Sequence, residues 1–195
     1  MRRALPFLAL AALVAILVIG LTQAGGGDDG ASAGGSSTTT PKASLEGAPP
    51  PLAALYRRAN TIEDASVDDL RAQLRELRGH PVVLNAWASW CGPCKFEFPF
   101  FQQATAKVGT KVAFLALNVQ DNRTDAQRFL RSRPVAYPSL EDGDGKLLRE
   151  AAGGVRGLPV TVFFDAHGRR SFVHQGGYPN ATALLADISR YAPSA

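Results

Sequence analysis

Residues 81–99 read PVVLNAWASWCGPCKFEFP. The first seven residues form a nearly continuous apolar run, which is typical of a central strand buried on both faces of a parallel sheet. Two cysteines, Cys91 and Cys94, follow this strand directly, and a helix is expected to begin at Cys91 and to run to about Lys107. A buried strand that leads into a helix at a cysteine pair predicts an α/β domain with a chemical site at the junction.

The segments on either side extend this α/β pattern. Ser66 with Asp69 forms a capping box for a helix that begins at residue 67, Thr124 with Gln127 forms another, and Asn180 is expected to cap a helix that runs to residue 191. Further expected elements are a strand at 111–119, a turn and a short helix within 137–152, and a hairpin of strands at 159–164 and 170–174. This order predicts a mixed central sheet with helices on both faces.

The cysteine pair is expected to carry the chemistry of the chain. A thiolate is the nucleophile in thiol–disulfide exchange, and the positive end of a helix dipole lowers the pKa of a thiol placed there. Two intervening residues let the second sulfur resolve a mixed disulfide formed on the first. We therefore predict that Cys91 is the attacking, more exposed thiol, that Cys94 is the buried resolving thiol, and that the two form a redox-active disulfide.

Other uses of the pair are less favoured. A zinc site needs two more ligands, and the sequence has no second C-x-x-C and no paired-histidine motif. Covalent haem attachment needs histidine directly after the second cysteine, where the sequence has Lys95. A purely structural disulfide that closes so short a loop would add little stability. We expect no metal and no cofactor, and we expect the three histidines, His80, His167 and His174, to lie at the surface.

Composition excludes several broad classes of protein. The chain has 195 residues, of which 46% are hydrophobic and 19% charged, so it is neither disordered throughout nor fibrous. The net charge of +4 is spread along the chain, which argues against a dedicated nucleic-acid-binding protein. Two cysteines are too few for a disulfide-stapled scaffold.

The N-terminal residues predict an exported protein. Arg2 and Arg3 precede an uncharged apolar run, 4–21. As a helix this run would span about 27 Å, close to the thickness of the hydrocarbon core of a bilayer. We interpret residues 1–21 as a single-pass anchor in the cell membrane, with a cytoplasmic N-terminus and an extracytoplasmic catalytic domain. The alternative is a signal peptide that is cleaved near residues 22–24, which would leave a secreted protein.

A linker is expected to separate this segment from one folded domain. Gly, Ser, Thr and Pro make up 19 of the 30 residues at 22–51, and no aromatic residue occurs there. Such a segment cannot bury enough apolar surface to offset its ordering entropy, so we expect a flexible tether. Residues 52–195 are long enough to form a single core.

Two motifs resemble a known superfamily. The core W-C-G-P-C at 90–94, with G-L-P-V-T at 157–161, resembles the thioredoxin-like superfamily. The C-x-x-E-x-P extension that starts at Cys94, together with Asn85, is similar more narrowly to the membrane-anchored, extracytoplasmic TlpA/ResA-type thiol–disulfide oxidoreductases. The resemblance covers about residues 67–191 and implies a thioredoxin-like fold.

The resemblance also implies a peptide-binding element. Pro159 matches the cis-proline of the superfamily, which faces the cysteine pair and leaves backbone groups free to pair with an incoming peptide. The Leu158–Pro159 bond is therefore expected to be cis, although X-Pro bonds in general are cis in only about 5–6% of cases. Trp90 is expected to flank the site and to contact the substrate.

A proton-transfer role is implied for Glu97. It matches the acidic residue of the C-x-x-E-x-P motif and follows Cys94 by three residues, hence on the same face of the helix. A carboxyl group desolvated beside a buried thiol would have a raised pKa and would exchange protons with that thiol. Asn85 stands where cytosolic thioredoxins have a buried aspartate, which leaves the role to Glu97. A solvated helix glutamate beside Lys95 is the alternative.

These observations predict an extracytoplasmic thiol–disulfide oxidoreductase tethered to the membrane. By resemblance, it would reduce cysteines of exported proteins such as apocytochromes c before haem attachment, and a membrane thiol–disulfide electron donor would supply the electrons. The same cysteines would serve a disulfide-forming oxidant, because the direction depends on how strongly the thiolate is stabilised. A redox-inactive peptide-binding module is a further alternative, disfavoured by the intact motif.

Overall fold

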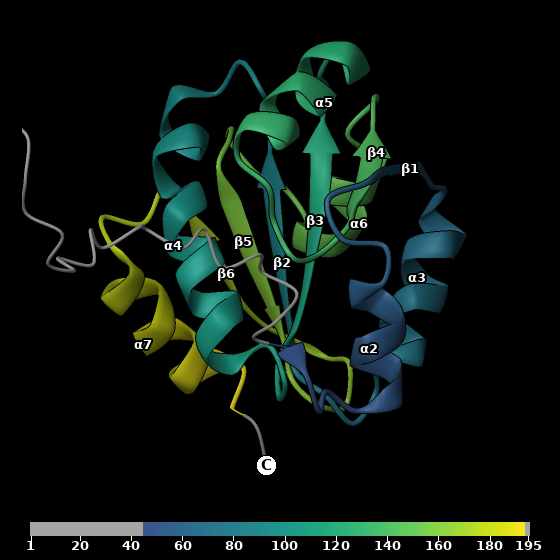
Figure 1. Ribbon diagram of the computed structural model, residues 1–195. Coiled ribbons are helices and arrows are strands. Elements are labelled where there is room, and N and C mark those ends of the chain that lie inside the picture. Colours follow the sequence, from purple (N-terminus) through teal and green to yellow (C-terminus); the bar gives the residue numbers. More distant parts are fainter. Residues whose placement is uncertain (1–44, 194–195) are drawn as a thin grey trace, which may run out of the picture. The chain divides into compact units, whose positions relative to one another are not determined.

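The structure is a computed structural model that describes residues 45–193 (Figure 1). The expected membrane anchor at 1–21 and most of the expected linker at 22–51 lie outside these residues. Within 45–193, no helix combines the length and the apolar character that a membrane crossing requires.

A mixed sheet forms the centre of the described part (Figure 1). Its strands lie in the order β1-β4-β3-β2-β5-β6, in which the first four are parallel and β5 and β6 each run antiparallel to the strand before. The central strands β2 and β3 are buried along their whole length, which explains their continuous apolar sequences. The strands are β1 (Ile62–Asp64), β2 (Val82–Trp87), β3 (Ala113–Val119), β4 (Ser139–Asp142), β5 (Val160–Phe164) and β6 (Arg170–Gln175).

Helices cover both faces of the sheet, as predicted (Figure 1). α4 and α7 pack together on one face, and α3 and α6 on the other. On the first face Trp87 is fully buried against Phe98 of α4 and Phe129 of α5, which fixes the helix that begins at the cysteine pair onto the sheet. The helices are α2 (Pro50–Tyr56), α3 (Val67–Glu76), α4 (Gly92–Val108), α5 (Arg123–Ser132), α6 (Lys146–Ala152) and α7 (Ala181–Tyr191).

Two of the three expected helix caps are confirmed. Ser66 forms the full capping box with Asp69, and the Asn180 side chain accepts a hydrogen bond from the backbone of α7. The expected cap at Thr124 is wrong. Asn122 caps α5 instead, because its extended backbone directs Oδ1 at the free N–H groups at the start of the helix.

Three elements went unrecognised in the sequence. Strands β1 and β4 have only three and four residues, too few for a period of two to show. The fold also extends N-terminal of position 52, since α2 begins at Pro50 and Leu45 is buried in the core. Leu45 packs against Gly109 so closely that a β-carbon there would collide with it.

Candidate active site

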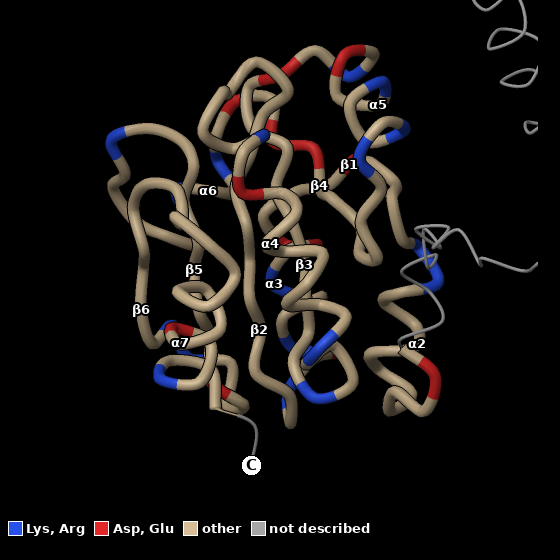
Figure 2. The backbone as a smooth tube through the Cα atoms, turned by 60° about the vertical axis from the view of Figure 1, so that its left-hand side comes forward, with Lys and Arg blue, Asp and Glu red and all other residues tan. Residues whose placement is uncertain are grey.

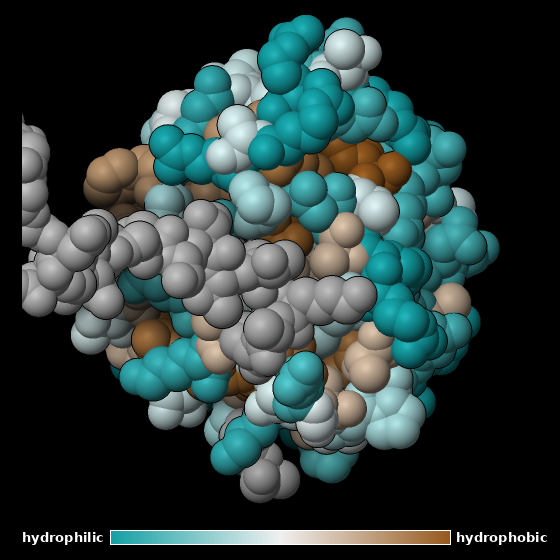
Figure 3. Space-filling view, in the orientation of Figure 1, coloured by the Kyte–Doolittle hydropathy of each residue, from teal (hydrophilic) through white to brown (hydrophobic). Residues whose placement is uncertain are grey.

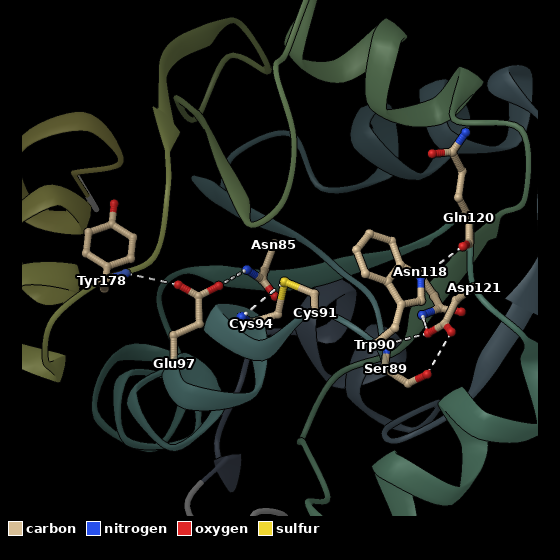
Figure 4. The surroundings of a disulfide bond; sticks show 10 residues. All are labelled: Asn85, Ser89, Trp90, Cys91, Cys94, Glu97, Asn118, Gln120, Asp121 and Tyr178. Carbon is tan, nitrogen blue, oxygen red and sulfur yellow. Dashed lines mark hydrogen bonds between the residues drawn. A yellow bond between two sulfur atoms is a disulfide. The ribbon is translucent and has the colours of Figure 1, made fainter.

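Cys91 and Cys94 form a disulfide at the N-terminus of α4 (Figure 4). Cys91 is the N-cap residue, and the backbone N–H of Cys94 donates to Cys91 Sγ over 3.2 Å. Cys91 is 4% exposed and Cys94 0%, the order that the sequence predicted. After reduction, the helix dipole and the N–H donor would both stabilise a thiolate at Cys91. The attacking role of Cys91 stays a prediction.

Glu97 lies one helical turn beyond Cys94 and is fully buried. Its Oε1 accepts a hydrogen bond from Asn85 Nδ2 over 3.0 Å, and its Oε2 accepts one from the backbone N–H of Tyr178 over 3.1 Å (Figure 4). Burial raises the pKa of Glu97 to about 7, and the two hydrogen bonds oppose part of that rise. The carboxyl group is therefore desolvated beneath the cysteine pair, as expected, and is not a solvated surface glutamate.

Asn85 is held in the sheet beside Thr161. The two residues are directly paired between β2 and β5, and both are buried. Asn85 Oδ1 and Thr161 Oγ1 have no hydrogen-bond partner among the described residues. Spare polar atoms therefore adjoin Glu97 on the sheet side, where they can accept or donate a hydrogen bond when its protonation changes.

The cis-proline also reaches the site. The Leu158–Pro159 peptide bond is cis, as the resemblance implied. A β-carbon built on Gly177 would lie 3.6 Å from Pro159 Cγ and 3.8 Å from both Glu97 Oε2 and Pro93 Cβ. The proline that precedes β5, the dipeptide between the cysteines and the buried carboxyl therefore converge on one glycine. Substrate pairing with the backbone of Leu158 stays a prediction.

Trp90 lies at the surface on the opposite side of the disulfide from Glu97 (Figure 4). Its side chain is 61% exposed, and its Nε1 donates to the carbonyl of Gln120 over 3.0 Å. Phe96, which the sequence analysis did not single out, is 63% exposed and packs edge-to-face on Phe100. Trp90, which directly precedes Cys91, and Phe96 are therefore exposed aromatic side chains near the start of α4. On the face shown in Figure 3, apolar residues form separate patches among hydrophilic ones.

Asp121 anchors the loop that carries the first cysteine (Figure 4). Its carboxylate accepts hydrogen bonds from the backbone N–H and the hydroxyl of Ser89, from Asn118 Nδ2 and from the backbone N–H of Asn122. A pattern in the sequence was available for this contact. Ser89 follows β2 and Asp121 follows β3, and neighbouring parallel strands end at the same edge of a sheet.

The contacts of the C-terminal segment were also missed. Tyr178 donates a hydrogen bond to Glu97 from its backbone N–H. Every residue except proline has this donor, so the residue type at position 178 gives no sign of the contact. His174 is half-buried rather than at the surface, because its ring stacks on Tyr178 at 4.1 Å between centroids. Within residues 45–193 no group of three or more His, Cys, Asp or Glu side chains is arranged to hold a metal ion.

Comparison with known proteins identifies the family. The model of the Redoxin family matches residues 46–188, most of the chain. The chain belongs to the Redoxin family. A thiol–disulfide oxidoreductase ResA from Halalkalibacterium halodurans is 32% identical to this redoxin over 128 residues, which cover 64% of the chain and 72% of the relative. A thiol:disulfide interchange protein DsbE from Yersinia pestis is 33% identical over 139 residues, 69% of the chain and 66% of the relative.

Solved structures agree with this assignment. A structure described as a thiol:disulfide interchange protein DsbE from Chlorobium tepidum matches with a TM-score of 0.55 and 32% identity. The match covers 60% of this redoxin and 84% of that chain. The fold is thus thioredoxin-like, as the resemblance implied. The redoxin is a thiol–disulfide oxidoreductase of the ResA/DsbE type, with Cys91 and Cys94 at bonding distance.

Proposed function

We propose that this redoxin reduces disulfides in exported proteins, with the cysteines of apocytochromes c as clients. The observation that carries the proposal is the buried carboxyl of Glu97, whose pKa of about 7 lets it take up and release protons near neutral pH. It lies next to the thiol that must lose a proton during each cycle, Cys94. The cytochrome clients follow from the TlpA/ResA resemblance, and the relatives' names extend no further than thiol–disulfide exchange.

The reductive cycle begins at Cys91. Its thiolate attacks one sulfur of the client disulfide, an S–S bond forms between enzyme and client, and the other client sulfur leaves as a thiolate that takes a proton from solvent. Cys94 then gives its proton to the Glu97 carboxylate and attacks Cys91 Sγ. The second client thiolate leaves, and the enzyme is left with the disulfide seen here. Two electrons have passed from the dithiol to the client.

A further thiol–disulfide exchange must regenerate the dithiol. The electrons come from a membrane dithiol donor, which is oxidised to its disulfide as Cys91 and Cys94 are reduced. The proposal includes a domain outside the cytoplasm, tethered by residues 1–21, as the sequence led us to expect. Membrane fractionation of the expressed protein, followed by N-terminal sequencing, tests the tether. A mature chain that begins near residue 25 in the medium would contradict it and support the secreted alternative.

Activity is tested by insulin reduction with the full chain. Cys91→Ser should abolish turnover. Cys94→Ser should also block turnover while it keeps the attacking thiol, and so should accumulate mixed disulfides with clients. A Cys91→Ser rate equal to that of the native chain would contradict the mechanism. Mixed disulfides trapped in membranes by Cys94→Ser should contain apocytochromes c, and recovery of other exported proteins alone would contradict this choice of client.

The direction of electron flow is tested by the reduction potential. Equilibration of the full chain in glutathione buffers gives the dithiol–disulfide ratio directly. We expect a potential near that of reducing thioredoxins, about −270 mV. A value near that of a dedicated disulfide donor, about −120 mV, would instead assign the chain to the formation of disulfides.

A further inference from the structure

A hollow of about 380 Å³ lies between Trp90, which directly precedes Cys91, and the segment that leads into Pro159. It is formed by the loop after β2, the end of β3, helix α6 and the loop between α6 and β5. Its size falls within the range of pockets that hold small ligands or a few side chains. Its lining includes Trp90, Val119, Leu148, Arg149, Val155 and Arg156.

The two arginines of this lining are exposed and carry no ion pair. Neither Arg149 nor Arg156 forms a salt bridge or a side-chain hydrogen bond with another residue of 45–193. Two guanidinium groups that lack a direct carboxylate partner, each able to make paired hydrogen bonds to a carboxylate, therefore line one hollow.

The carboxylates nearby are engaged elsewhere. Asp142 accepts hydrogen bonds from the backbone N–H groups of Leu147 and Leu148 at the start of α6. Asp144 forms its direct ion pair with Lys146, and its interaction with Arg149 is a weaker electrostatic one without a hydrogen bond. Asp121, which follows Gln120 of the lining in the chain, accepts hydrogen bonds from Ser89, Asn118 and Asn122. No carboxylate of the lining itself offsets the arginines.

We propose that this hollow binds an acidic segment of the client polypeptide that flanks the reacting cysteine. The inference rests on the proposed function, because it requires the client sulfur to meet Cys91. Trp90 adjoins Cys91 in sequence and Leu158 adjoins Pro159, and both border the hollow. An extended chain advances about 3.3 Å per residue, so residues within a few positions of a sulfur at Cys91 reach the arginines.

The charge that attracts such a segment is local. Along the backbone of the described residues, acidic and basic positions are interspersed (Figure 2). Selection therefore depends on the residues close to the client cysteine and not on the net charge of the client. The apolar lining, with Trp90 largely exposed, suits the stems of glutamate side chains and favours a peptide over a lipid headgroup.

The test uses three peptides that differ only in the residues around one cysteine. Each carries the cysteine as a 2-pyridyl disulfide, an uncharged leaving group, flanked on both sides by two Glu, two Gln or two Lys. The reduced full chain attacks the peptide sulfur, and Cys91 forms the mixed disulfide as 2-thiopyridone is released. Cys94 then displaces the peptide thiol. Each rate is divided by the rate of the same peptide with 2-mercaptoethanol, which removes differences in intrinsic reactivity.

The normalised rate should fall in the order Glu, Gln, Lys. Two partly exposed charge pairs predict a Glu-to-Gln ratio of about threefold to tenfold, reduced by added salt. The double substitution Arg149→Gln and Arg156→Gln should bring this ratio to one. Lys107→Gln, which removes one cation at the far end of α4, about 22 Å along the helix axis from its first residue, should leave the ratio unchanged.

Three results would overturn the inference, each in a different way. Equal normalised rates for all three peptides would refute acidic selection and leave the proposed reductase intact, since exchange would still occur. Failure of every peptide to react would refute the proposed function along with it. Vesicles of phosphatidylglycerol that bind the chain through Arg149 and Arg156, without any peptide preference, would assign the arginines to a membrane surface instead.

Discussion

Asn85 and Glu97 meet side chain to side chain in the core, with Asn85 Nδ2 donating to Glu97 Oε1 over 3.0 Å. The amide is neutral, so it satisfies the carboxyl group without supplying the positive charge that would hold it ionised. Burial raises the pKa of Glu97, and the hydrogen bond from Asn85 offsets only part of that rise. The protonation of Glu97 can therefore be examined through the pH dependence of stability as well as through activity.

The oxidised native chain should lose stability as the pH rises from about 4.5 to about 7. The pKa of Glu97 is raised from 4.5 to about 7, so the folded state holds a proton that the unfolded state has released. The loss across this window should be roughly 3 kcal/mol. Urea denaturation of Glu97→Gln at several pH values should show this slope removed. The exposed Glu46→Gln serves as control, and a slope unchanged in Glu97→Gln would contradict the raised pKa.

Asn85→Asp should place two carboxyl groups in contact in a buried site. Ionising two adjacent buried carboxyl groups together costs much free energy, because their negative charges repel in a desolvated site. The pair should therefore retain one proton above neutral pH. Destabilisation relative to the native chain should reach about 3 kcal/mol or more at pH 8 and be smaller at pH 5. Asn122→Asp, at an exposed helix cap where aspartate is favourable, is the matched control. Equal loss at both pH values would count against the contact.

Asp121→Ala should loosen the loop that presents Cys91. The substitution leaves the Ser89 N–H and hydroxyl without their acceptor, which should cost about 2–3 kcal/mol of unfolding free energy. Misplacement of the attacking sulfur should slow exchange with a pyridyl disulfide about tenfold. Asp125→Ala, which removes only a surface pair with Arg128, should change both quantities little. An Asp121→Ala rate equal to that of this control would show that the anchor does not position Cys91.

Leu45→Ala should destabilise the domain even though position 45 precedes its first helix. The side chain is buried against Gly109, so its removal leaves a cavity and should lower the free energy of unfolding by about 2 kcal/mol. Chemical denaturation of the full chain measures the loss. The neighbouring Glu46→Ala, which is exposed, should shift the unfolding free energy by less than about 0.5 kcal/mol. A Leu45→Ala value as small as this would remove Leu45 from the core.

Prediction from the sequence was most accurate where one continuous segment contains both the secondary structure and the reactive residues. The apolar run of β2 and the cysteine pair after it placed the junction correctly, and helical spacing placed Glu97 beneath Cys94. The short strands β1 and β4 were not predicted, because what makes these residues strands is their pairing with strands far away in the sequence. The site contacts that escaped are of the same kind. The Asp121–Ser89 anchor and the Tyr178–Glu97 bond join residues far apart in the chain, and the second uses only the main chain.

That main-chain bond has a consequence for biosynthesis. Tyr178 follows every other residue of the site along the chain, just before α7, yet it donates to the carboxyl group of Glu97 in the helix that begins at the cysteine pair. A nascent polypeptide that has emerged only as far as β5 already carries both sulfurs but lacks this donor. The hydrogen bonds of Glu97 are therefore complete only after β6 has been made, and a product terminated before Tyr178 would carry both cysteines without this donor to Glu97.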